Sequence, residues 1–257
     1  MNLVDMHTHP RAHGKIPGGN SSMLQKYIKK AVDMGITELG FSDHDWVLDQ
    51  INWEKISELD NSSNIKIKKG LEIEYIPGTE DRIEKILKSF PLDYCIGSVH
   101  SIGGWVFDHP DYKNKFNERK IDDIYSDYFQ LLKNAVNSGY FDIIGHIDLI
   151  KIFGHRPDNL DIMELINPVL ELICSNEIVL EINTNGLNKP IGEIYPSRQI
   201  IQRACEMGIY FTLGSDAHTP ERVGENLKDA AEILIEFGYD EIITFENRQK
   251  KVIKLDY

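Results

Sequence analysis

Almost every segment of this chain that has the composition of a buried strand ends in a residue that can bind a metal ion. One apolar run followed by a histidine is unremarkable, but six runs that end in imidazole or carboxylate groups indicate that these ends converge in space. The side chains concerned are His7, His9, His44, Glu72, His100, His146, Asp216 and His218. The pattern predicts strands whose carboxyl ends meet at one polynuclear metal site.

Short apolar segments alternate with longer amphipathic ones, which predicts parallel strands joined by crossover helices. The expected strands are Asn2–His7, Glu38–Ser42, Lys66–Glu74, Tyr94–Val99, Asp142–His146, Ile178–Asn183 and Tyr210–Ser215. The expected helices are Ser22–Met34, Thr79–Ser89, Ile121–Ser138, Asp161–Ser175, Pro196–Met207 and Glu221–Phe237. Seven such units favour a closed or nearly closed barrel over an open sheet, and a weak eighth apolar segment, Glu241–Phe245, precedes a short basic tail.

The length of 257 residues suits one globular domain over residues 1–257. Within it, the irregular stretch 101–120 is rich in Gly, Asp and Asn and is long for a connection in a compact domain. We therefore expect this stretch to be a substrate lid. Its histidine, His109, is expected to be an ordinary surface residue.

The net charge limits the kinds of molecule that this protein is expected to bind. The net charge of −13, from 28 basic and 41 acidic residues, argues against a nucleic-acid or anionic-membrane surface, which would need a basic footprint. The three cysteines are far apart and odd in number, so they indicate neither a disulfide framework nor a zinc ribbon. No apolar run approaches the ~18 residues that span a bilayer, and no leader pattern opens the chain. A cytoplasmic protein with a small-molecule substrate is expected, and the sequence sets no oligomeric state.

Two pairs of ligand-type residues share one spacing. His7 and His9 are two apart on a strand, so both imidazoles point to the same face and can bind one metal. Asp216 and His218 repeat the spacing, and His13 lies in the loop beyond His9. Each histidine taken alone is more simply explained as a core residue bonded to a carbonyl group. That explanation fails for the set, because seven of the nine histidines occupy these positions.

The chemistry of the set indicates the metal and the reaction. Many imidazoles with few carboxylates favour Zn²⁺, Mn²⁺ or Fe²⁺ over Mg²⁺ or Ca²⁺, which prefer oxygen ligands. Glu72 is the natural bridging ligand, since a carboxylate can offer one oxygen to each of two metals. Metals that share a bridge acidify a water that attacks an electrophile, and they bind the substrate oxygens. Hydrolysis of a phosphate ester fits this arrangement best. The acidic net charge does not exclude a phosphate substrate, because bound divalent cations would reverse the sign of the field inside a pocket.

Six motifs resemble those of the PHP (polymerase and histidinol phosphatase) family, and they cover nearly the whole chain. They are Asp5-Met-His-Thr-His9, Ser42-Asp-His-Asp45, Gly70-Leu-Glu-Ile-Glu74, Gly97-Ser-Val-His100, Gly145-His-Ile-Asp148 and Gly214-Ser-Asp-Ala-His218. The resemblance implies a distorted (β/α)7 TIM-like barrel of one domain with three divalent metal ions. By that likeness, the three metals are bound by His7, His9, Glu72 and Asp216; by Glu72, His100 and His146; and by His13, His44 and His218.

Two further stretches resemble the histidinol-phosphate phosphatase branch of the family. They are Gly103-Gly-Trp-Val-Phe-Asp108 and Glu181-Ile-Asn-Thr-Asn-Gly-Leu-Asn-Lys-Pro190, the latter followed by Glu193-Ile-Tyr-Pro-Ser197. That branch is expected to have an Arg where Asn188 stands, so one cation for the phosphate is missing here. The candidate phosphate-binding residues that remain are Arg156, Lys189 and Arg198. In the lid, Asp108 and Trp105 are candidates for a counter-charge and an aromatic wall facing the substrate's ammonium and imidazole.

The expected activity is hydrolysis of L-histidinol phosphate to L-histidinol and phosphate, with Glu72, Asp216 and His218 as catalytic residues. The sequence does not choose among Asp216, His218 and a metal with its bound water as the group that stabilises or protonates the leaving alkoxide. One alternative is a phosphoesterase acting on another phosphate monoester, such as phosphotyrosine, a nucleotide or a nucleic-acid end. A second is an amidohydrolase, which commonly bridges its metals with a carboxylated lysine. A third is a metal-binding or regulatory protein that has kept the fold.

Overall fold

A seven-stranded parallel sheet forms the centre of the protein, in the order β1-β2-β3-β4-β7-β8-β9. The computed structural model describes residues 1–11 and 21–255. The strands are β1 (Leu3–Asp5), β2 (Ile36–Phe41), β3 (Lys66–Glu74), β4 (Tyr94–Ser98), β7 (Ile143–Ile144), β8 (Val179–Asn183) and β9 (Phe211–Gly214). Each matches one of the strands expected from the sequence to within a few residues. The alternation of apolar and amphipathic segments was therefore sufficient to locate all seven.

The two edge strands of this sheet, β1 and β9, are joined by backbone hydrogen bonds. The amide of Met6 donates to the carbonyl of Leu213 at 2.8 Å. The carboxylate of Asp5, at the end of β1, accepts hydrogen bonds from the amide of Ser215 at 2.9 Å, from its hydroxyl at 2.6 Å, and from the amide of Gly224 at 2.9 Å. Burial raises the pKa of Asp5 to about 6, against the opposing effect of these hydrogen bonds. The sheet is therefore a near-closed barrel.

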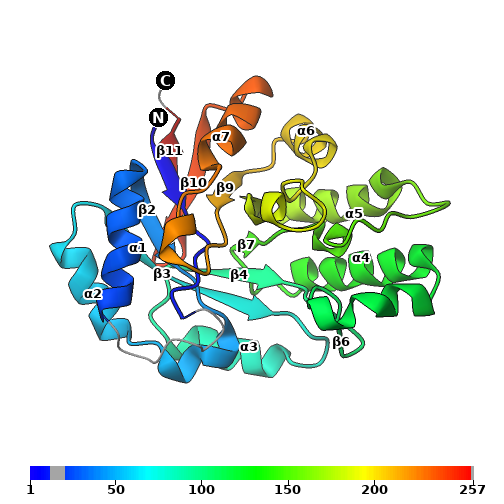
Figure 1. Ribbon diagram of the computed structural model, residues 1–257, viewed down its shortest axis with the longest axis horizontal. Helices are drawn as coiled ribbons and strands as arrows, with labels where there is room; N and C mark the ends of the chain where they lie inside the picture. Colours follow the sequence, from blue (N-terminus) through cyan, green and yellow to red (C-terminus); the bar gives the residue numbers. More distant parts are fainter. Residues whose placement is uncertain (12–20, 256–257) are drawn as a thin grey trace.

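Helices surround the strands (Figure 1), as expected for a barrel in which each strand is followed by a crossover helix. Their apolar faces turn toward the sheet; in α4, for example, Ile124, Tyr128, Leu132 and Ala135 recur at helical spacing and are all buried. The helices are α1 (Ser21–Asp33), α2 (Trp53–Ser62), α3 (Glu80–Ser89), α4 (Ile121–Asn137), α5 (Ile162–Ser175), α6 (Arg198–Glu206) and α7 (Leu227–Glu236).

Two helices differ from the expectation. No helix was predicted for α2, which begins after Asn52, whose side chain accepts a hydrogen bond from the amide of Lys55 at 2.8 Å. The predicted helix Glu221–Phe237 begins six residues late, as α7. Gly224 and Asn226 both have positive φ, 75° and 58°, which a continuous right-handed helix does not allow.

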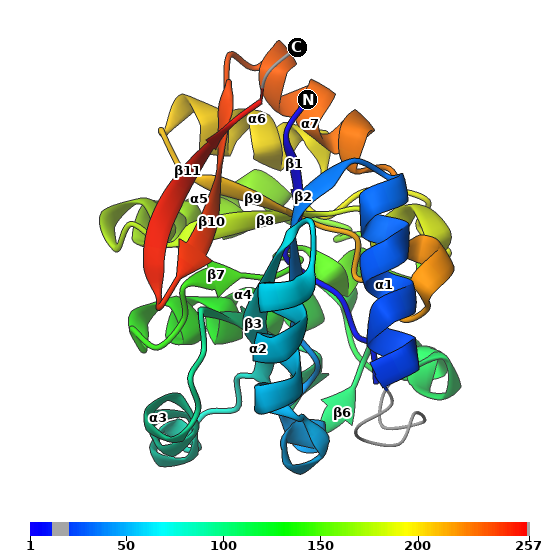
Figure 2. The same cartoon turned by 90° about the vertical axis from the view of Figure 1, so that its left-hand side faces the viewer.

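The weak eighth segment does not join the barrel. It forms β10 (Glu241–Glu246), which pairs in antiparallel fashion with β11 (Gln249–Lys254) as a separate hairpin. Figure 2 shows this hairpin, in red, alongside the barrel strands. At its turn, the guanidinium of Arg248 donates to the carboxylate of Asp142 at 2.9 Å, immediately before β7 begins. The hairpin therefore packs against the amino end of the barrel.

Aromatic side chains fill the barrel interior at that end. The hydroxyl of Tyr94, in β4, donates to the carbonyl of Met6 at 2.6 Å. The ring of Phe245, in the hairpin, stacks on Tyr94 with 6.0 Å between centroids. Gly40 and Gly70 make room for Tyr94, since a Cβ on Gly40 would lie 1.8 Å from the tyrosine oxygen. The amino end is thus closed by packing.

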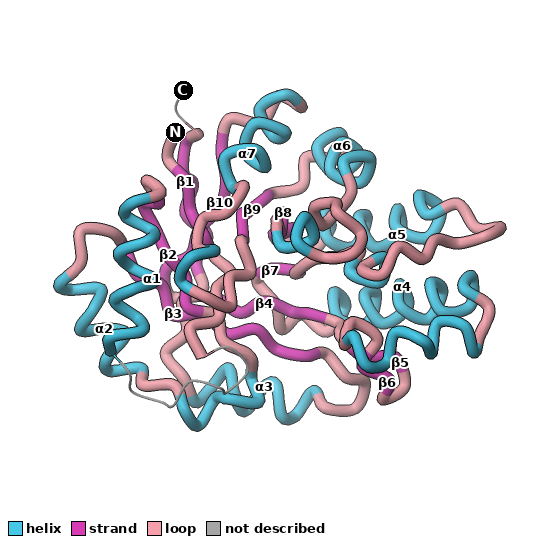
Figure 3. Tube along the Cα trace, viewed as in Figure 1, coloured by secondary structure: helices cyan, strands magenta, loops and turns pink. Residues whose placement is uncertain are grey.

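The segment 101–120 is ordered rather than irregular. It contains two short antiparallel strands, β5 (Ser101–Ile102) and β6 (Trp105–Val106), followed by a 3-10 run over Pro110–Glu118. Figure 3 places these strands beside α4, away from the barrel strands. No helix in the described part of the chain has the length and apolar character needed to cross a membrane.

Candidate metal centre

Glu72, in β3, lies at the centre of the carboxyl end of the barrel and is 1% exposed. Five imidazole nitrogens lie within 3.5 Å of its two carboxylate oxygens. Each comes from the residues that follow a barrel strand, so the parallel sheet brings together side chains that are far apart in sequence. The partners are His44 at 2.7 Å, His146 at 3.1 Å, His100 at 3.3 Å, His7 at 3.4 Å and His9 at 3.5 Å.

Asp216 closes the other side of this cluster, after β9. Its Oδ1 atom lies 3.2 Å from Nε2 of His9, 3.9 Å from Nε2 of His7 and 3.5 Å from Nδ1 of His218. Asn185 donates from its side chain to Oδ2 of Asp216 at 2.9 Å. Asp216 has a φ of 51°, a conformation that costs energy for a non-glycine residue, so the chain holds this carboxylate in place against local strain.

Four groups of three side chains have ligand atoms within 4.8 Å of one another. One is the trio Glu72, His100 and His146 that the resemblance implies for the second metal. The trio His7, His9 and Glu72 is part of the set implied for the first metal. The other two groups are His9, His44 and His218, and His7, His146 and Asp216. His13, expected to share a metal with His44 and His218, lies outside the described residues.

The donor atoms of the cluster fit divalent cations. Nε2 of His7, Nδ1 of His146 and Oε2 of Glu72 are buried and make no hydrogen bond within the described chain. Burial alone would raise the pKa of Glu72, but the surrounding histidines hold it well below its usual range. An ionised carboxylate among imidazole lone pairs is a set of ligands suited to Zn²⁺, Mn²⁺ or Fe²⁺.

Two carboxylates that the sequence did not single out orient the histidines. Glu181, in β8, lies 2.6 Å from Nδ1 of His7 through one oxygen, and its other oxygen accepts the amide of His146 at 2.8 Å. Glu74 lies 2.6 Å from Nδ1 of His100. Such carboxylates fix the ring orientation and tautomer of a metal-binding histidine. The signal was present in the sequence, because Glu74 follows Glu72 by two positions on the same strand.

Close packing sets the position of Glu181. Gly214 lies opposite it, and a Cβ there would lie 2.2 Å from Oε1 of Glu181 and 2.6 Å from the Cβ of His7. Any larger residue at position 214 would therefore push the carboxylate away from the imidazole it orients.

A cavity of about 180 Å³ opens onto the cluster. Its walls combine ligand-type side chains with residues from the segment 101–120 and from the loops after β7 and β8. The lining residues are His44, Glu72, His100, Asp108, His109, Pro110, His146, Leu149, Ile152, Asn185, Lys189, Tyr195, Asp216 and His218. His109, expected to be an ordinary surface residue, is 52% exposed and also lines this cavity, just before the 3-10 run that begins at Pro110.

The predicted substrate-binding residues separate into two sets. Asp108 and Lys189 line the cavity. Arg156 does not, because its guanidinium is held by Glu193 at 2.8 Å. Arg198 is also elsewhere: it forms an ion pair with Glu236 and lies 4.9 Å from the ring of Phe237, on the outer surface. The structure therefore brings one of the three candidate phosphate-binding cations to the cluster.

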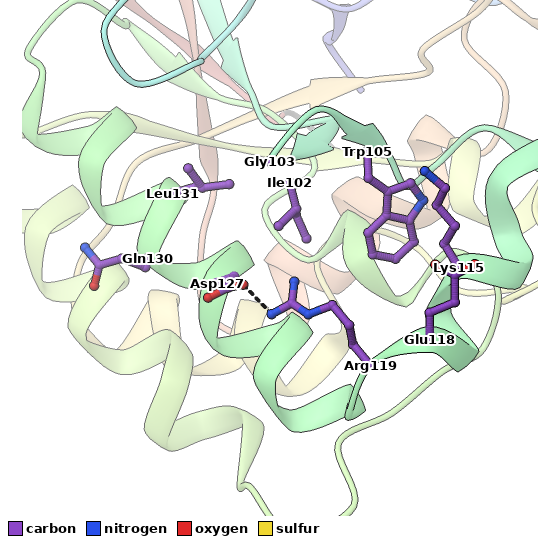
Figure 4. A pocket seen from close by; sticks show the side chains of 9 residues that line it. All are labelled: Ile102, Gly103, Trp105, Lys115, Glu118, Arg119, Asp127, Gln130 and Leu131. Carbon is purple, nitrogen blue, oxygen red and sulfur yellow. Dashed lines mark hydrogen bonds and ion pairs between the residues drawn. The ribbon is translucent and has the colours of Figure 1, made fainter.

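Trp105 also lies away from the metal centre. Its ring packs edge-on against Phe116 with 4.7 Å between centroids, and it is 8% exposed. It lines a separate hollow between the lid and α4, where Figure 4 shows it near Lys115, with Arg119 bonded to Asp127. Trp105 therefore packs within the segment 101–120, where its indole nitrogen also donates to the carbonyl of Tyr112 at 3.3 Å, and it is not among the residues that line the cavity at the cluster.

The PHP domain family matches residues 5–185, which is most of the chain and includes the motifs from His7 to His146. The chain belongs to the PHP domain family. Along almost its full length, this PHP protein is also similar to curated relatives. A probable histidinol-phosphatase of Deinococcus radiodurans is 36% identical, over 96% of this chain and 98% of the relative. The histidinol-phosphatase of Lactococcus lactis is 26% identical, over 99% of this chain and 100% of the relative.

Solved structures agree on the fold of the PHP domain. The crystal structure of histidinol phosphate phosphatase from Lactococcus lactis, a complex with zinc, L-histidinol and phosphate, superposes with a TM-score of 0.80 at 22% identity. The match covers 97% of this chain and 98% of that one. A histidinol phosphatase structure from Listeria monocytogenes gives a TM-score of 0.72 at 22% identity, over 88% of this chain and 98% of that one.

Proposed function

We propose that this protein is a metal-dependent phosphatase that hydrolyses L-histidinol phosphate to L-histidinol and phosphate. The observation that carries the proposal is a buried carboxylate, Glu72, with five imidazole nitrogens within 3.5 Å. Glu72 lines a cavity that Asp108 also lines. The names and full-length match of the curated relatives support the same activity. As an enzyme of histidine synthesis it would act in the cytoplasm, on a small phosphate monoester.

The cluster is proposed to hold three divalent cations, Zn²⁺, Mn²⁺ or Fe²⁺, with the ligand sets that the family resemblance implies. Bound there, such cations acidify a water molecule and neutralise the oxygens of a phosphate ester. Glu72 holds the centre of the cluster together, since its two oxygens face different histidines. Glu181 and Glu74 keep the rings of His7 and His100 in the orientation that ligation needs.

Lys189 and Asn185 line the cavity together with Asp216, and Asn185 donates to Asp216 at 2.9 Å. Lys189 and Asn185 are proposed to contact the phosphate group. The leaving alkoxide needs a proton or a compensating charge. Asp216 and His218 are the proposed groups, and the side chain of His218 is 26% exposed, which leaves it accessible to substrate.

Asp108 is proposed to recognise the organic part of the substrate. Its Oδ1 atom makes no hydrogen bond within the described chain. Burial raises the pKa of Asp108, so a cation that pairs with the carboxylate would favour its ionised form. The ammonium group of histidinol phosphate is such a cation. The segment 101–120, which carries Asp108, is proposed to act as the substrate lid of a single-domain enzyme.

The bridging position speaks against an amidohydrolase. Glu72 occupies the centre of the cluster, and its two oxygens already lie within 3.5 Å of five imidazole nitrogens. A carboxylate therefore stands at the bridging position that a carboxylated lysine commonly takes in an amidohydrolase.

The test is phosphate release from L-histidinol phosphate, phosphotyrosine, AMP and p-nitrophenyl phosphate, with protein loaded separately with Mn²⁺, Zn²⁺ or Fe²⁺. We expect kcat/KM for L-histidinol phosphate to exceed the others by at least ~100-fold, roughly 2.7 kcal/mol in transition-state binding. Asp108→Asn should reduce this preference to about tenfold or less without changing the rate on p-nitrophenyl phosphate, which has no cation to pair. Asp123→Asn, at an exposed position of α4 outside the cavity, is the matched control.

Equal rates on all four esters would leave a general phosphoesterase. A preference that survives Asp108→Asn would remove Asp108 from substrate recognition but leave the phosphatase assignment intact.

A further inference from the structure

Five tyrosine side chains are fully buried among the residues that the structure describes, and Tyr195 differs from the other four. Each of those four donates its hydroxyl to a backbone carbonyl. The donors are Tyr27 to His9 at 3.0 Å, Tyr94 to Met6 at 2.6 Å, Tyr125 to His155 at 2.6 Å and Tyr128 to His146 at 3.4 Å. The hydroxyl of Tyr195 is buried and has no hydrogen-bond partner within the described residues.

A buried hydroxyl without a partner destabilises the fold, because it has lost its hydrogen bonds to water and gained none in return. Such a group inside a packed core would be a defect. Tyr195, however, lines the cavity above the metal-ligand cluster, together with Glu72, His146 and Lys189. Its ring lies 6.4 Å from that of His146, at an interplanar angle of 78°. The missing partner can therefore come from a ligand.

Close packing and backbone hydrogen bonds fix Tyr195. It is 1% exposed, and its ring packs against Gly186, where a Cβ would lie 2.8 Å from the ring. Its amide donates to the carbonyl of Asn183 at 2.9 Å, and the amide of Asn183 donates back at 2.6 Å, which fixes the residue against the end of β8. The preceding residue, Ile194, accepts a hydrogen bond at 2.8 Å from the ammonium of Lys151, which is fully buried. The same ammonium lies 5.3 Å from the centre of the Tyr195 ring. The hydroxyl is thus held in place before substrate arrives.

A phenol is protonated at neutral pH, since its ordinary pKa is about 10, and it acts there as a hydrogen-bond donor. In the proposed function the phosphate group must reach the metal-ligand cluster to be hydrolysed, and it would bring acceptor oxygens into the cavity that Tyr195 lines. We propose that the hydroxyl of Tyr195 donates a hydrogen bond to an oxygen of the substrate phosphate group, which makes Tyr195 a further catalytic residue. This inference rests on the proposed function. A donor already in position stabilises charge that develops in the transition state without reorganisation.

The test compares Tyr195→Phe with Tyr125→Phe in metal-loaded enzyme. Tyr195→Phe should lower kcat/KM about 10- to 100-fold, equally on L-histidinol phosphate and p-nitrophenyl phosphate because both carry the phosphate group. Inhibition by inorganic phosphate should weaken by about tenfold, a loss of one hydrogen bond to a charged group. Its thermal midpoint should stay the same or rise, since no protein hydrogen bond is lost. Tyr125→Phe, which does lose one, should unfold at a lower temperature and keep its activity within about twofold.

Unchanged activity and phosphate inhibition in Tyr195→Phe would overturn the inference. A loss confined to L-histidinol phosphate would also overturn it, because the hydroxyl would then contact the organic part of the substrate. Metal content is measured in parallel, and a loss of metal that accounts for the loss of rate would assign Tyr195 to the support of His146 instead. If wild-type protein cleaves no ester of the panel, the proposed function fails, and titration of inorganic phosphate into the metal-loaded wild type and variant still tests the contact.

Discussion

The two ends of the barrel are closed by opposite kinds of side chain. At the carboxyl end, buried imidazoles and carboxylates surround Glu72, and some of their polar atoms have no hydrogen-bond partner in the described chain. At the amino end, Tyr94 and Phe245 stack, and the hydroxyl of Tyr94 has its partner. One end is incomplete without a ligand, whereas the other is complete by itself. The comparison indicates that the carboxyl ends of the strands carry the site of the reaction, whereas the amino ends contribute stability, as in other barrels of this type.

The largest expected effect is at the carboxyl end. Glu72→Gln removes the charge shared by five histidines, and we expect it to lower kcat/KM by about 10³-fold or more, since the bound metals supply several kcal/mol of transition-state stabilisation. It should also abolish the stabilisation that metal confers on wild type, about 2.7 kcal/mol at a metal concentration 100 times the Kd. Activity, metal content and thermal midpoint with and without chelator are the measurements. Glu84→Gln, at an exposed helix position, is the control. Unchanged turnover would contradict the role of Glu72.

The matching change at the amino end is Phe245→Ala. Phe245 is 1% exposed and stacks on Tyr94, so its removal should lower the free energy of unfolding by about 3–5 kcal/mol. Because the site lies at the other end, kcat/KM should stay within about twofold at a temperature where the variant is folded. Denaturant unfolding and steady-state kinetics check this, with Val252→Ala, 55% exposed in β11, as the control. A large loss of activity in the folded variant would show that the ends are coupled.

A smaller effect is expected one step away from the metal. Glu181→Gln keeps the shape of the side chain but weakens the interaction that orients His7, so metal affinity should fall by about 10- to 100-fold. Competition with a chelating dye measures this, and Glu177→Gln, an exposed neighbour, is the control. At saturating metal, much of the activity should return. Unaltered affinity would mean that close packing at Gly214 is enough to hold the imidazole.

The sequence predicted features that depend on local patterns and missed those that depend on contacts between residues far apart in the chain. The seven strands and the residues that converge on Glu72 were predictable, because strand patterns are local and parallel strands bring their carboxyl ends together. The orienting role of Glu181 was not, because a carboxylate inside an apolar strand gives no sign of which distant imidazole it faces. The pairing of β10 with β11 was also missed. It depends on a turn at Asn247 and Arg248, both with positive φ, and on contacts with residues more than a hundred positions away.

The arginines and Trp105 were predicted to bind substrate, and their actual positions show the same limit of prediction from local sequence. Their side chains are of types that bind a phosphate or an aromatic group. The sequence around Arg198, however, does not indicate that its ion-pair partner is Glu236. Partner choice on a surface is decided by which helices lie side by side. Lys189 and Asp108, in contrast, lie close in sequence to strand ends and to the lid, and the structure places both in the cavity.

The closure of the barrel between β1 and β9 also determines when, during synthesis of the chain, the site can be completed. Two of the four candidate metal groups include Asp216 or His218, and Asp5 takes its hydrogen-bond partners from Ser215 and Gly224. A ribosome makes His7 and His9 early, yet these partners are added only after some two hundred further residues. During synthesis the proposed metal site therefore stays incomplete until the last barrel strand has been made. Any binding of metal to the full set of ligands would come after that strand.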